Sequence, residues 1–299
     1  MLIPSRFVHV APLALALGFG CSGGSSSDTT LSGGSAGAAA GSAEQADNTA
    51  GSGGSGALAG SGGGGGSSGS PEAIVLPTRI ERYLRATSPR LIIEVDAVQG
   101  LEPYPGSLTY LGSWLSSLID KPEGISFEAD ETLEPQGSDT EWTFEALDRF
   151  AREHARDDAE GPARIHVLSL DGRYVAEGSG TVLGLAWGNR YVALFQDALR
   201  GRCEAGLTGA LQQDVCESAE RNVWAHEFGH TLGLVDNGIP MVTDHRDPEH
   251  GRHDVREGCL MYWAYDGAEL FDTLLGRLGS ANQDLELCAE SEADISAAR

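Results

Sequence analysis

The sequence predicts an α+β domain built on a mixed, twisted sheet backed by helices. The sheet is indicated by apolar, β-branched runs at residues 90–98 and 163–170, which are typical of buried strands. The helices are indicated by residues 109–120 and 139–157, where apolar side chains recur at helical spacing. Strands that alternate with helices along the chain favour a sheet covered by helices.

The remaining elements follow from local patterns. Residues 125–133 alternate apolar with polar side chains, which predicts a half-exposed strand, and Asp139 is the N-cap candidate of the helix at 139–157. Strands at 180–187 and 190–199 are expected to be joined by a tight turn at Gly188 and Asn189. The expected order is strand 90–98, helix 109–120, strand 125–133, helix 139–157, strands 163–170, 180–187 and 190–199, and then a helix that includes residues 224–235.

The stretch "LGLAWGN", residues 183–189, has two interpretations. It is either an edge strand, which could pair with an extended peptide by strand addition, or a strand inside the sheet. The sequence leaves both open.

The N-terminus has the pattern of an export signal. In residues 1–21, Arg6 precedes an apolar run, and small residues lead to Cys21. A cysteine so placed, followed by a flexible leash, is typical of bacterial lipoproteins, so we expect lipid attachment at Cys21. The alternative is cleavage near Gly20 and release. Residues 22–74 are rich in Gly and Ser and predict a disordered linker, which leaves residues 75–299 as one folded domain.

The chain is strongly acidic, with a formal net charge of −24. Residues 1–70 contribute −2 of this, from Arg6 against Asp28, Glu44 and Asp47, so the folded part carries −22. Such a charge repels nucleic acid and anionic lipid headgroups. We therefore expect no nucleic-acid partner and membrane contact only through a lipid anchor. The protein is also expected to be a monomer.

Four cysteines remain once Cys21 is set aside: Cys203, Cys216, Cys259 and Cys288. In an exported chain they favour two disulfides, and sequence alone allows three pairings. The short local loop favours Cys203 with Cys216, which leaves Cys259 for Cys288. Neither spacing is that of a CxxC zinc site, so structural zinc on sulfur is not expected.

The stretch "WAHEFGHTLGLVDN", residues 224–237, suggests a metal site. On a helix, His226 and His230 project from one face about 5–6 Å apart, close enough to bind one zinc ion. Glu227 can then act as general base on a zinc-activated water. The alternative is that His-Glu-His is the polar face of a helix whose apolar face is buried. Gly233 can adopt the positive φ that ends the helix, which brings Asp236 to the position of a third ligand.

The motif HExxHxxGxxD, followed by "GCLMYW" at residues 258–263, resembles the metzincin clan of zinc peptidases, including its snapalysin-like members. The resemblance implies a metzincin-like fold with an active-site helix and a smaller irregular C-terminal subdomain. It also implies one catalytic zinc on His226, His230 and Asp236, and a methionine turn at Met261 beneath the metal. Met261 could instead be ordinary core packing.

The stretch "HDVREGCLM", residues 253–261, also resembles the archaemetzincin pattern, although Asp254 stands where that pattern has its first cysteine. His253 is therefore an alternative third ligand, followed by His250 or His245. Tyr262, or Tyr265, could stabilise the transition state through its hydroxyl. A second ion such as Ca²⁺ could bind the acidic side chains of the same loop, which are Asp244, Asp247, Glu249 and Asp254.

The expected function is that of an exported zinc metalloendopeptidase, a cell-envelope or outer-membrane lipoprotein or alternatively a secreted protein, that hydrolyses peptide or protein substrates. Two alternatives remain from other classes. One is an inactive surface lipoprotein that binds metal or protein, and the other is a zinc hydrolase with a non-peptide substrate.

Overall fold

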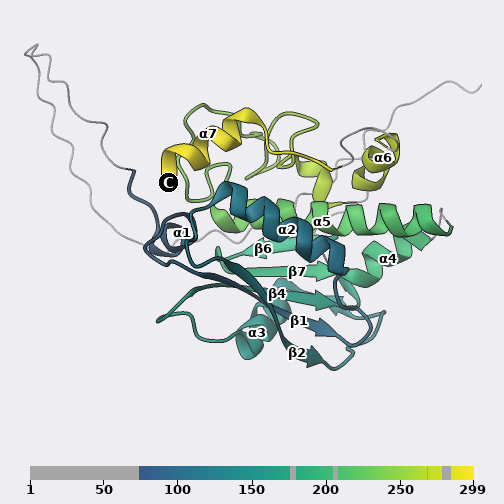
Figure 1. The fold of residues 1–299 in the computed structure, drawn as a ribbon. Coiled ribbons are helices and arrows are strands. Elements are labelled where there is room, and N and C mark those ends of the chain that lie inside the picture. Colours follow the sequence, from purple (N-terminus) through teal and green to yellow (C-terminus); the bar gives the residue numbers. More distant parts are fainter. Residues whose placement is uncertain (1–73, 176–179, 205–207, 268, 278–283) are drawn as a thin grey trace, which may run out of the picture. The chain divides into compact units, whose positions relative to one another are not determined.

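A five-stranded mixed sheet forms the centre of the computed structural model, which describes residues 74–175, 180–204, 208–267, 269–277 and 284–299 (Figure 1). The strand order is β2-β1-β4-β7-β6, and all neighbours are parallel except β7 and β6. The strands are β1 Leu91–Val98, β2 Ile125–Leu133, β4 Ala163–Leu170, β6 Gly184–Trp187 and β7 Tyr191–Phe195. A separate two-stranded pair consists of β3 Glu141–Trp142 and β5 Arg173–Tyr174. The expected signal segment, with Cys21, and nearly all of the expected linker lie outside the described residues.

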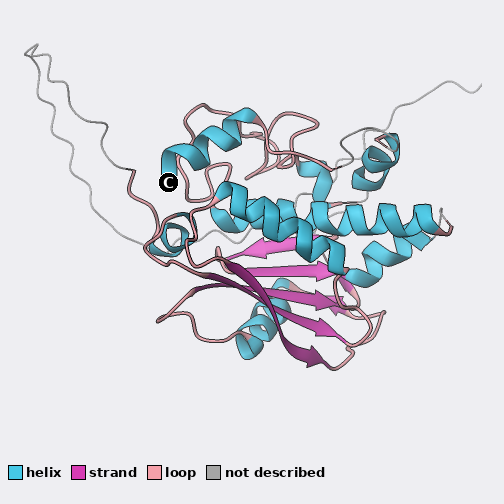
Figure 2. Ribbon diagram, in the orientation of Figure 1, coloured by secondary structure: helices cyan, strands magenta, loops and turns pink. Residues whose placement is uncertain are grey.

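Helices cover both faces of this sheet. Helices α2 and α5 lie on one face and α3 on the other (Figures 1 and 2). An apolar core fills the space on each face. The helices are α1 Thr78–Leu84, α2 Pro105–Leu118, α3 Phe144–His154, α4 Gln196–Glu204, α5 Ala210–Leu232, α6 Glu269–Gly276 and α7 Ala289–Ala298, with a short 3₁₀ helix, η1, at Trp263–Asp266. The predicted fold class, a mixed sheet with backing helices, is confirmed.

Side chains alternate between the two faces along each strand, and this alternation determines in which of the two apolar cores a residue packs. On β1, Ile93 and Val95 pack in the core beneath α5, whereas Val98 packs in the core beneath α3. Successive side chains of a strand point to opposite faces, so Glu94 and Asp96 share the α3 face with Val98. The sheet therefore separates two chemically different regions of the molecule.

The predicted helix at 139–157 begins later than Asp139. Its N-cap is Thr143, whose hydroxyl accepts a hydrogen bond from the backbone nitrogen of Ala146 at 3.2 Å. The preceding Glu141 and Trp142 form β3 instead, because they pair with β5 far along the chain, and Trp142 donates from Nε1 to the carbonyl of Asp171. A long-range pairing overrides the local helix signal here.

The two interpretations of residues 183–189 are resolved, since β6 is the last strand in the sheet order. The turn that joins it to β7 has positive φ at Gly188 (61°) and Asn189 (48°), as predicted. The strand expected at 190–199 ends at Phe195, and α4 begins at the next residue, Gln196.

The chain beyond α5 forms the irregular C-terminal subdomain that was expected. Residues 233–262 are held by isolated bridges, among them Asp254 with Arg246 and with Tyr262. The structure pairs Cys203 with Cys216 and Cys259 with Cys288, the pairs that the spacing favoured. The second disulfide ties the loop that carries Cys259 to the start of α7 within this subdomain.

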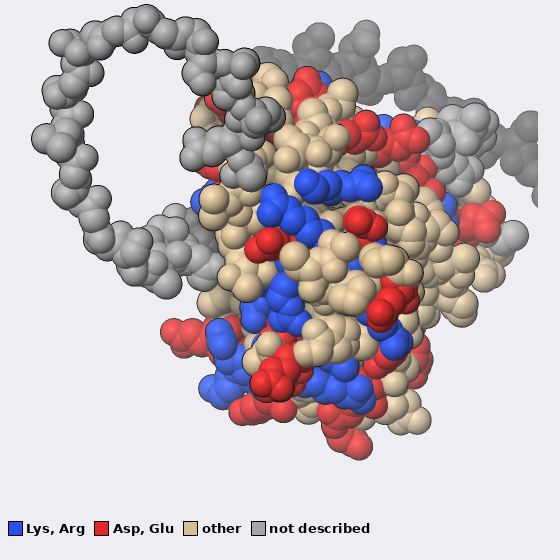
Figure 3. Space-filling model, turned by 60° about the vertical axis from the view of Figure 1, so that its left-hand side comes forward, with Lys and Arg blue, Asp and Glu red and all other residues tan. Residues whose placement is uncertain are grey.

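Surface charges contribute little to the stability of this fold. On the face in Figure 3, basic side chains lie beside acidic ones. Pairs such as Arg90 with Glu128 (3.4 Å) and Arg152 with Asp148 (2.8 Å) are partly exposed, and exposed pairs contribute at most about 1 kcal/mol each. Within the described ranges, no helix is long and apolar enough to span a membrane.

Candidate metal centre

Three histidine side chains meet beside α5. His226 and His230 lie one turn apart on this helix, and His253 belongs to the irregular subdomain. Nε2 of His230 lies 3.1 Å from Nε2 of His226 and 3.3 Å from Nε2 of His253. All three residues are buried, and a ligand atom of each lies within 4.8 Å of the others. The rings therefore converge on one point.

Backbone carbonyls orient two of the three rings. Nδ1 of His226 lies 2.7 Å from the carbonyl oxygen of Leu260, and Nδ1 of His253 lies 2.6 Å from that of His250. A carbonyl only accepts, so each Nδ1 donates its proton and the lone pair stays on Nε2. Metal-binding histidines are commonly held in this way through their other nitrogen.

The arrangement fits a zinc ion. Two Zn–N bonds of about 2.0–2.1 Å at a tetrahedral angle hold the nitrogens about 3.3 Å apart. The observed separations of 3.1 and 3.3 Å agree with this spacing. A zinc ion held by three histidines would have the ligand number of a catalytic rather than a structural site.

Burial keeps the three imidazoles neutral. It lowers the pKa of His226 to about 3 and that of His253 to about 4. The pKa of His230 is also lowered, first by burial and then by the neighbouring His226 and His253. A neutral imidazole is the form that binds a metal, so the three side chains are competent ligands at neutral pH.

Glu227, the candidate base, is buried between α5 and the edge strand β6. A Cβ built on Gly184 of β6 would lie 2.7 Å from Oε1 of Glu227 and 2.6 Å from Cγ1 of Val223. Such separations are too short for real carbon atoms, so glycine is required to let the carboxylate lie against β6. This contact places the base beside the strand that ends the sheet.

Met261 packs directly beneath the ligand-bearing turn of α5. A Cβ built on Gly229, which lies between His226 and His230, would come within 3.0 Å of Cε of Met261 and closer still to its sulfur. Met261 is fully buried. The side chain named from the methionine-turn resemblance thus contacts the helix at the level of the ligands.

The C-terminus of α5 is held by a glycine and two asparagines. Gly233 has φ 99°, the left-handed conformation predicted for it. Nδ2 of Asn237 donates to the carbonyl of His230 at 2.8 Å, and Nδ2 of Asn189, from the β6–β7 turn, approaches the same oxygen at 3.3 Å. These bonds satisfy carbonyls that a helix end leaves unpaired and tie the ligand helix to the sheet.

Asp236, the expected third ligand, is not brought to this centre. Its side chain is half exposed, and Oδ2 pairs with Arg246 at 3.2 Å and Arg252 at 3.4 Å. Two successive positive φ values, at Val235 (53°) and Asp236 (60°), turn the chain after Gly233. The structure places His253, the first alternative, in the third position instead.

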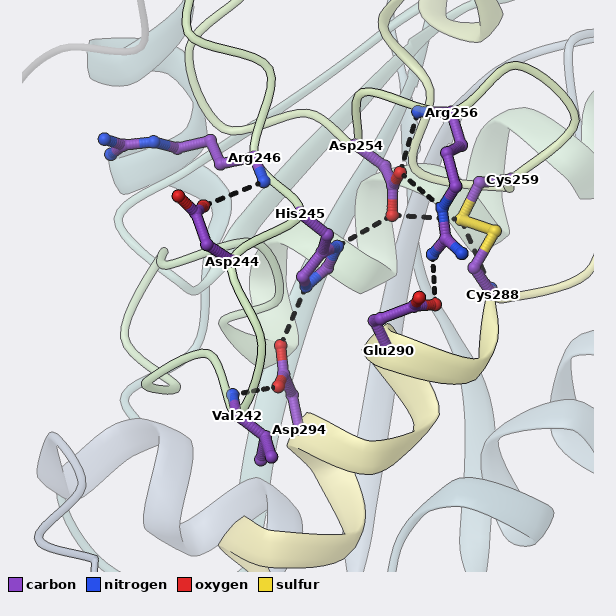
Figure 4. A network of polar contacts seen from close by, with 10 residues as sticks. All are labelled: Val242, Asp244, His245, Arg246, Asp254, Arg256, Cys259, Cys288, Glu290 and Asp294. Carbon is purple, nitrogen blue, oxygen red and sulfur yellow. Dashed lines mark hydrogen bonds and ion pairs between the residues drawn. A yellow bond between two sulfur atoms is a disulfide. The ribbon is translucent and has the colours of Figure 1, made fainter.

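His245, another alternative ligand, lies in a separate buried network (Figure 4). Its Nδ1 lies 2.7 Å from Oδ2 of Asp254, and its Nε2 lies 3.0 Å from Oδ2 of Asp294 on α7. The backbone nitrogen of Asp254, the residue after His253, donates to the carbonyl of Met261 at 2.7 Å. This network supports the segment that carries the third ligand.

His250 and the candidate Ca²⁺ ligands also have other partners. The His250 ring stacks on Trp263 with centroids 4.2 Å apart, and its Nδ1 lies 2.7 Å from Oδ2 of Asp247. The loop carboxylates do not form a group that could share an ion in the described part of the chain. These carboxylates are Asp244, Asp247, Glu249 and Asp254.

The tyrosines differ in surroundings. Tyr262 is partly buried and packs against Trp263 and Tyr265. The hydroxyl of Tyr265 accepts a hydrogen bond from the backbone nitrogen of Gly258 at 3.0 Å, a contact that holds the turn before Met261. The hydroxyl of Tyr265 therefore has a structural role in this turn.

Sequence reasoning missed two residues that shape the centre, Gly184 and Gly229. Gly229 lies inside α5, where glycine is unfavourable by roughly 0.5–1 kcal/mol relative to alanine, and Gly184 is the first residue of β6. An interior glycine often marks a close approach of two segments, and that signal was available. What each glycine approaches, Glu227 or Met261, depends on the fold.

Comparisons with known proteins add a distant likeness in fold. No protein-family model matches the chain, and no curated protein matches it. Among solved structures, the chain is similar to an archaemetzincin from Methanopyrus kandleri, with 13% sequence identity and a TM-score of 0.43 over 70% of this chain and 94% of that chain. A likeness this distant carries no conclusion about chemistry, so the centre is interpreted from its own residues.

Proposed function

We propose that this protein is a zinc-dependent endopeptidase. The observation that carries the proposal is the convergence of the Nε2 atoms of His226, His230 and His253 at zinc-ligand spacing. Glu227 follows His226 directly in the sequence of α5. Three neutral histidines are the donor set of a catalytic zinc rather than of Mg²⁺ or Ca²⁺, which prefer oxygen ligands.

The chain's own residues supply the proton chemistry. Zinc in such a site lowers the pKa of water to about 7 and polarises a carbonyl. The carboxylate of Glu227 accepts the proton of the attacking water and returns it to the leaving amine. Leu260 and His250 hold the rings of His226 and His253 through their backbone carbonyls, so these ligands are oriented before substrate binds.

The position of Glu227 favours a peptide substrate. Its carboxylate lies against Gly184 of β6, the strand at the end of the sheet. An extended peptide that pairs with the edge of β6 would pass beside this carboxylate, and backbone pairing of this kind recognises a peptide irrespective of its side chains.

The substitution Glu227→Gln tests the proposal. It keeps the size of the side chain and removes the base, so peptide cleavage should fall by a factor of about 10²–10⁴ with the zinc content unchanged. Glu217→Gln, the same substitution further up α5, is the matched control and should retain activity. Cleavage by the Glu227 variant at the wild-type rate would refute the role given to this residue.

Substrate class is tested with a peptide library and a panel of small esters and amides. Cleavage of peptides, inhibited by a chelator and restored by zinc, is the expected result. Turnover of the small substrates alone would favour a non-peptide zinc hydrolase. Stoichiometric zinc without any turnover would favour a metal-binding surface protein.

We further propose that the domain is exported and tethered to the cell envelope through lipid on Cys21. The signal-like residues 1–21 and the Gly/Ser-rich residues 22–74 support this proposal. Cys21→Ser should abolish incorporation of labelled fatty acid and move the protein from the membrane fraction to the soluble fraction. Labelling of the serine variant at the wild-type level would exclude Cys21 as the attachment site.

A further inference from the structure

A second cluster of metal-ligating side chains lies on the opposite face of the sheet. Glu94 and Asp96 are two residues apart on β1, and His166 pairs with Glu94 in the register of β1 with β4. All three are at most 1% exposed, and one ligand atom of each lies within 4.8 Å of the others. The α5 core receives Ile93 and Val95 of β1, so this cluster lies on the α3 side, apart from the histidines of α5.

The hydrogen bonds within the cluster leave two atoms unused. Each oxygen of Asp96 has a partner, since Oδ1 accepts from the backbone nitrogen of Glu131 at 2.9 Å and Oδ2 lies 2.7 Å from Nε2 of His166. Oε1 of Glu94 accepts from the backbone nitrogen of Arg156 at 3.0 Å. Oε2 of Glu94 and Nδ1 of His166 have no hydrogen-bond partner among the residues that the structure describes.

The bond between Asp96 and His166 has a chemical consequence. When Nε2 of a neutral His166 donates to the carboxylate, its Nδ1 carries a free lone pair. Carboxylates commonly hold metal-binding histidines in this way, on the nitrogen that does not touch the metal. The two unpaired atoms are therefore one oxygen and one nitrogen, and each is of a kind that binds cations.

The charge of the cluster also calls for a cation. Two fully buried carboxylates carry a strongly unfavourable charge unless it is compensated. Arg156, whose backbone nitrogen bonds Glu94, pairs through its side chain with Glu128 and Asp130. Nη1 of Arg164 on β4 lies 3.9 Å from Glu128 and has no hydrogen-bond partner among the described residues. In the described ranges, neither Glu94 nor Asp96 has a lysine or arginine partner within 4.0 Å.

We propose that Glu94, Asp96 and His166 form a second, structural site for a divalent transition-metal ion such as Zn²⁺ or Mn²⁺. Glu94 and His166 supply the unused oxygen and nitrogen, and Asp96 fixes the His166 ring. The imidazole favours these ions over Mg²⁺ and Ca²⁺, which select oxygen. An ion here links β1 to β4 in the middle of the sheet and stabilises the fold without taking part in the reaction.

The test counts ions on the full chain after chelator treatment and reloading with Zn²⁺ or Mn²⁺. Wild-type protein should hold two zinc ions per chain, and a His226→Gln/His230→Gln background should hold one. Adding Glu94→Gln to that background should remove the remaining ion, because the amide keeps the bond to Arg156 but loses the charge. Glu128→Gln, its register neighbour on β2, is the matched control and should keep the ion.

Thermal unfolding gives a second readout that does not depend on activity. Zinc or manganese should raise the Tm of the His226→Gln/His230→Gln background and leave that of the Glu94→Gln derivative unchanged. Metal-free Glu94→Gln should melt no lower than its parent, because it removes a buried charge. A background protein that binds no ion and gains no Tm would overturn the proposal, as would equal binding by the Glu94 derivative. Neither outcome bears on the histidines of α5.

Discussion

The α5 ligands and the loop ligand of the candidate metal centre are positioned in different ways. His226 and His230 are held by the geometry of a single helix, whose turn of 3.6 residues brings positions i and i+4 together. His253 lies 23 residues beyond His230 and reaches the centre through contacts that are distant in sequence. Among these contacts are the bridges of Asp254 to Arg246 and Tyr262.

This difference explains which half of the site tolerates change. A helix keeps its two ligands aligned wherever the helix is packed, whereas the loop needs each of its supports to keep the third ligand in position. The supports are chemically varied and include a disulfide, a buried His–Asp network and backbone pairing beside Met261. Perturbations of the loop should therefore act on metal affinity first.

The largest expected effect separates His253 from Asp236. His253→Ala removes a ligand, and zinc affinity should fall by about 100-fold or more, beyond the cost of losing a residue that only orients a ligand. Asp236→Ala removes a half-exposed partner of two arginines, so affinity should change little. Competition with a chromophoric chelator measures both. The opposite ranking would make Asp236 the third ligand.

A smaller effect is expected where the helix meets the sheet. In Gly184→Ala, the added Cβ would lie too close to Cγ1 of Val223 and to Oε1 of Glu227, so it should push the carboxylate of Glu227 from its place. Because a misplacement of about 1 Å can cost about 100-fold in rate, kcat should fall toward that extent with zinc content unchanged. Gly180→Ala, whose Cβ would meet nothing within 4 Å, is the control. Equal activity of the two variants would show that the contact is not needed.

The features that could be predicted from the sequence are those set by local geometry, and the features that were missed depend on contacts distant in sequence. The strands at 90–98 and 163–170, the left-handed Gly233 and the pairing of His226 with His230 depend on local periodicity and spacing. The helix start at Asp139 was wrong because Trp142 pairs with a distant strand. Spacing also favoured Asp236 over His253, because the two positive φ values after Gly233 and the arginines that bind Asp236 are not visible in a one-dimensional pattern.

Removing either of the two disulfides should cost a similar free energy of unfolding, so their effects on zinc binding can be compared. Cys203 and Cys216 are 13 residues apart, and Cys259 and Cys288 are 29 apart, so a loop-entropy model gives about 3 kcal/mol for the first disulfide and about 3.6 kcal/mol for the second. Replacing either pair with serine should lower the free energy of unfolding by a similar amount. Only the Cys259–Cys288 variant should also weaken zinc binding, by about 10–100-fold, because Leu260 and Met261 follow Cys259 directly. Denaturant unfolding and zinc titration measure the two quantities; equal zinc affinity in both variants would contradict the support given to the loop.

The smallest expected effect is the dependence of stability on pH. Its sign should be opposite for the ligands His226 and His253 and for His245, which belongs to the network that supports the loop. The pKa values of His226 and His253 are lowered by burial, so the unfolded chain binds more protons and the metal-free protein loses stability as the pH falls from about 6.5 toward 4. The pKa of His245, in contrast, is raised. Burial is the largest single influence on it and acts to lower it, but the hydrogen bonds to Asp294 and Asp254 together outweigh burial.

The stabilisation from His245 is therefore fully present below its unfolded pKa of about 6.5 and is lost as the pH rises through the higher folded value. Thermal unfolding of the metal-free protein and of His245→Gln, measured between pH 5 and 9, tests this sign. The difference in Tm between the two should be largest at the acidic end and should shrink toward pH 9. A difference that grows with pH would mean that His245 lies neutral between its two aspartates, and the loop would then owe its position to the backbone bridges and the disulfide instead.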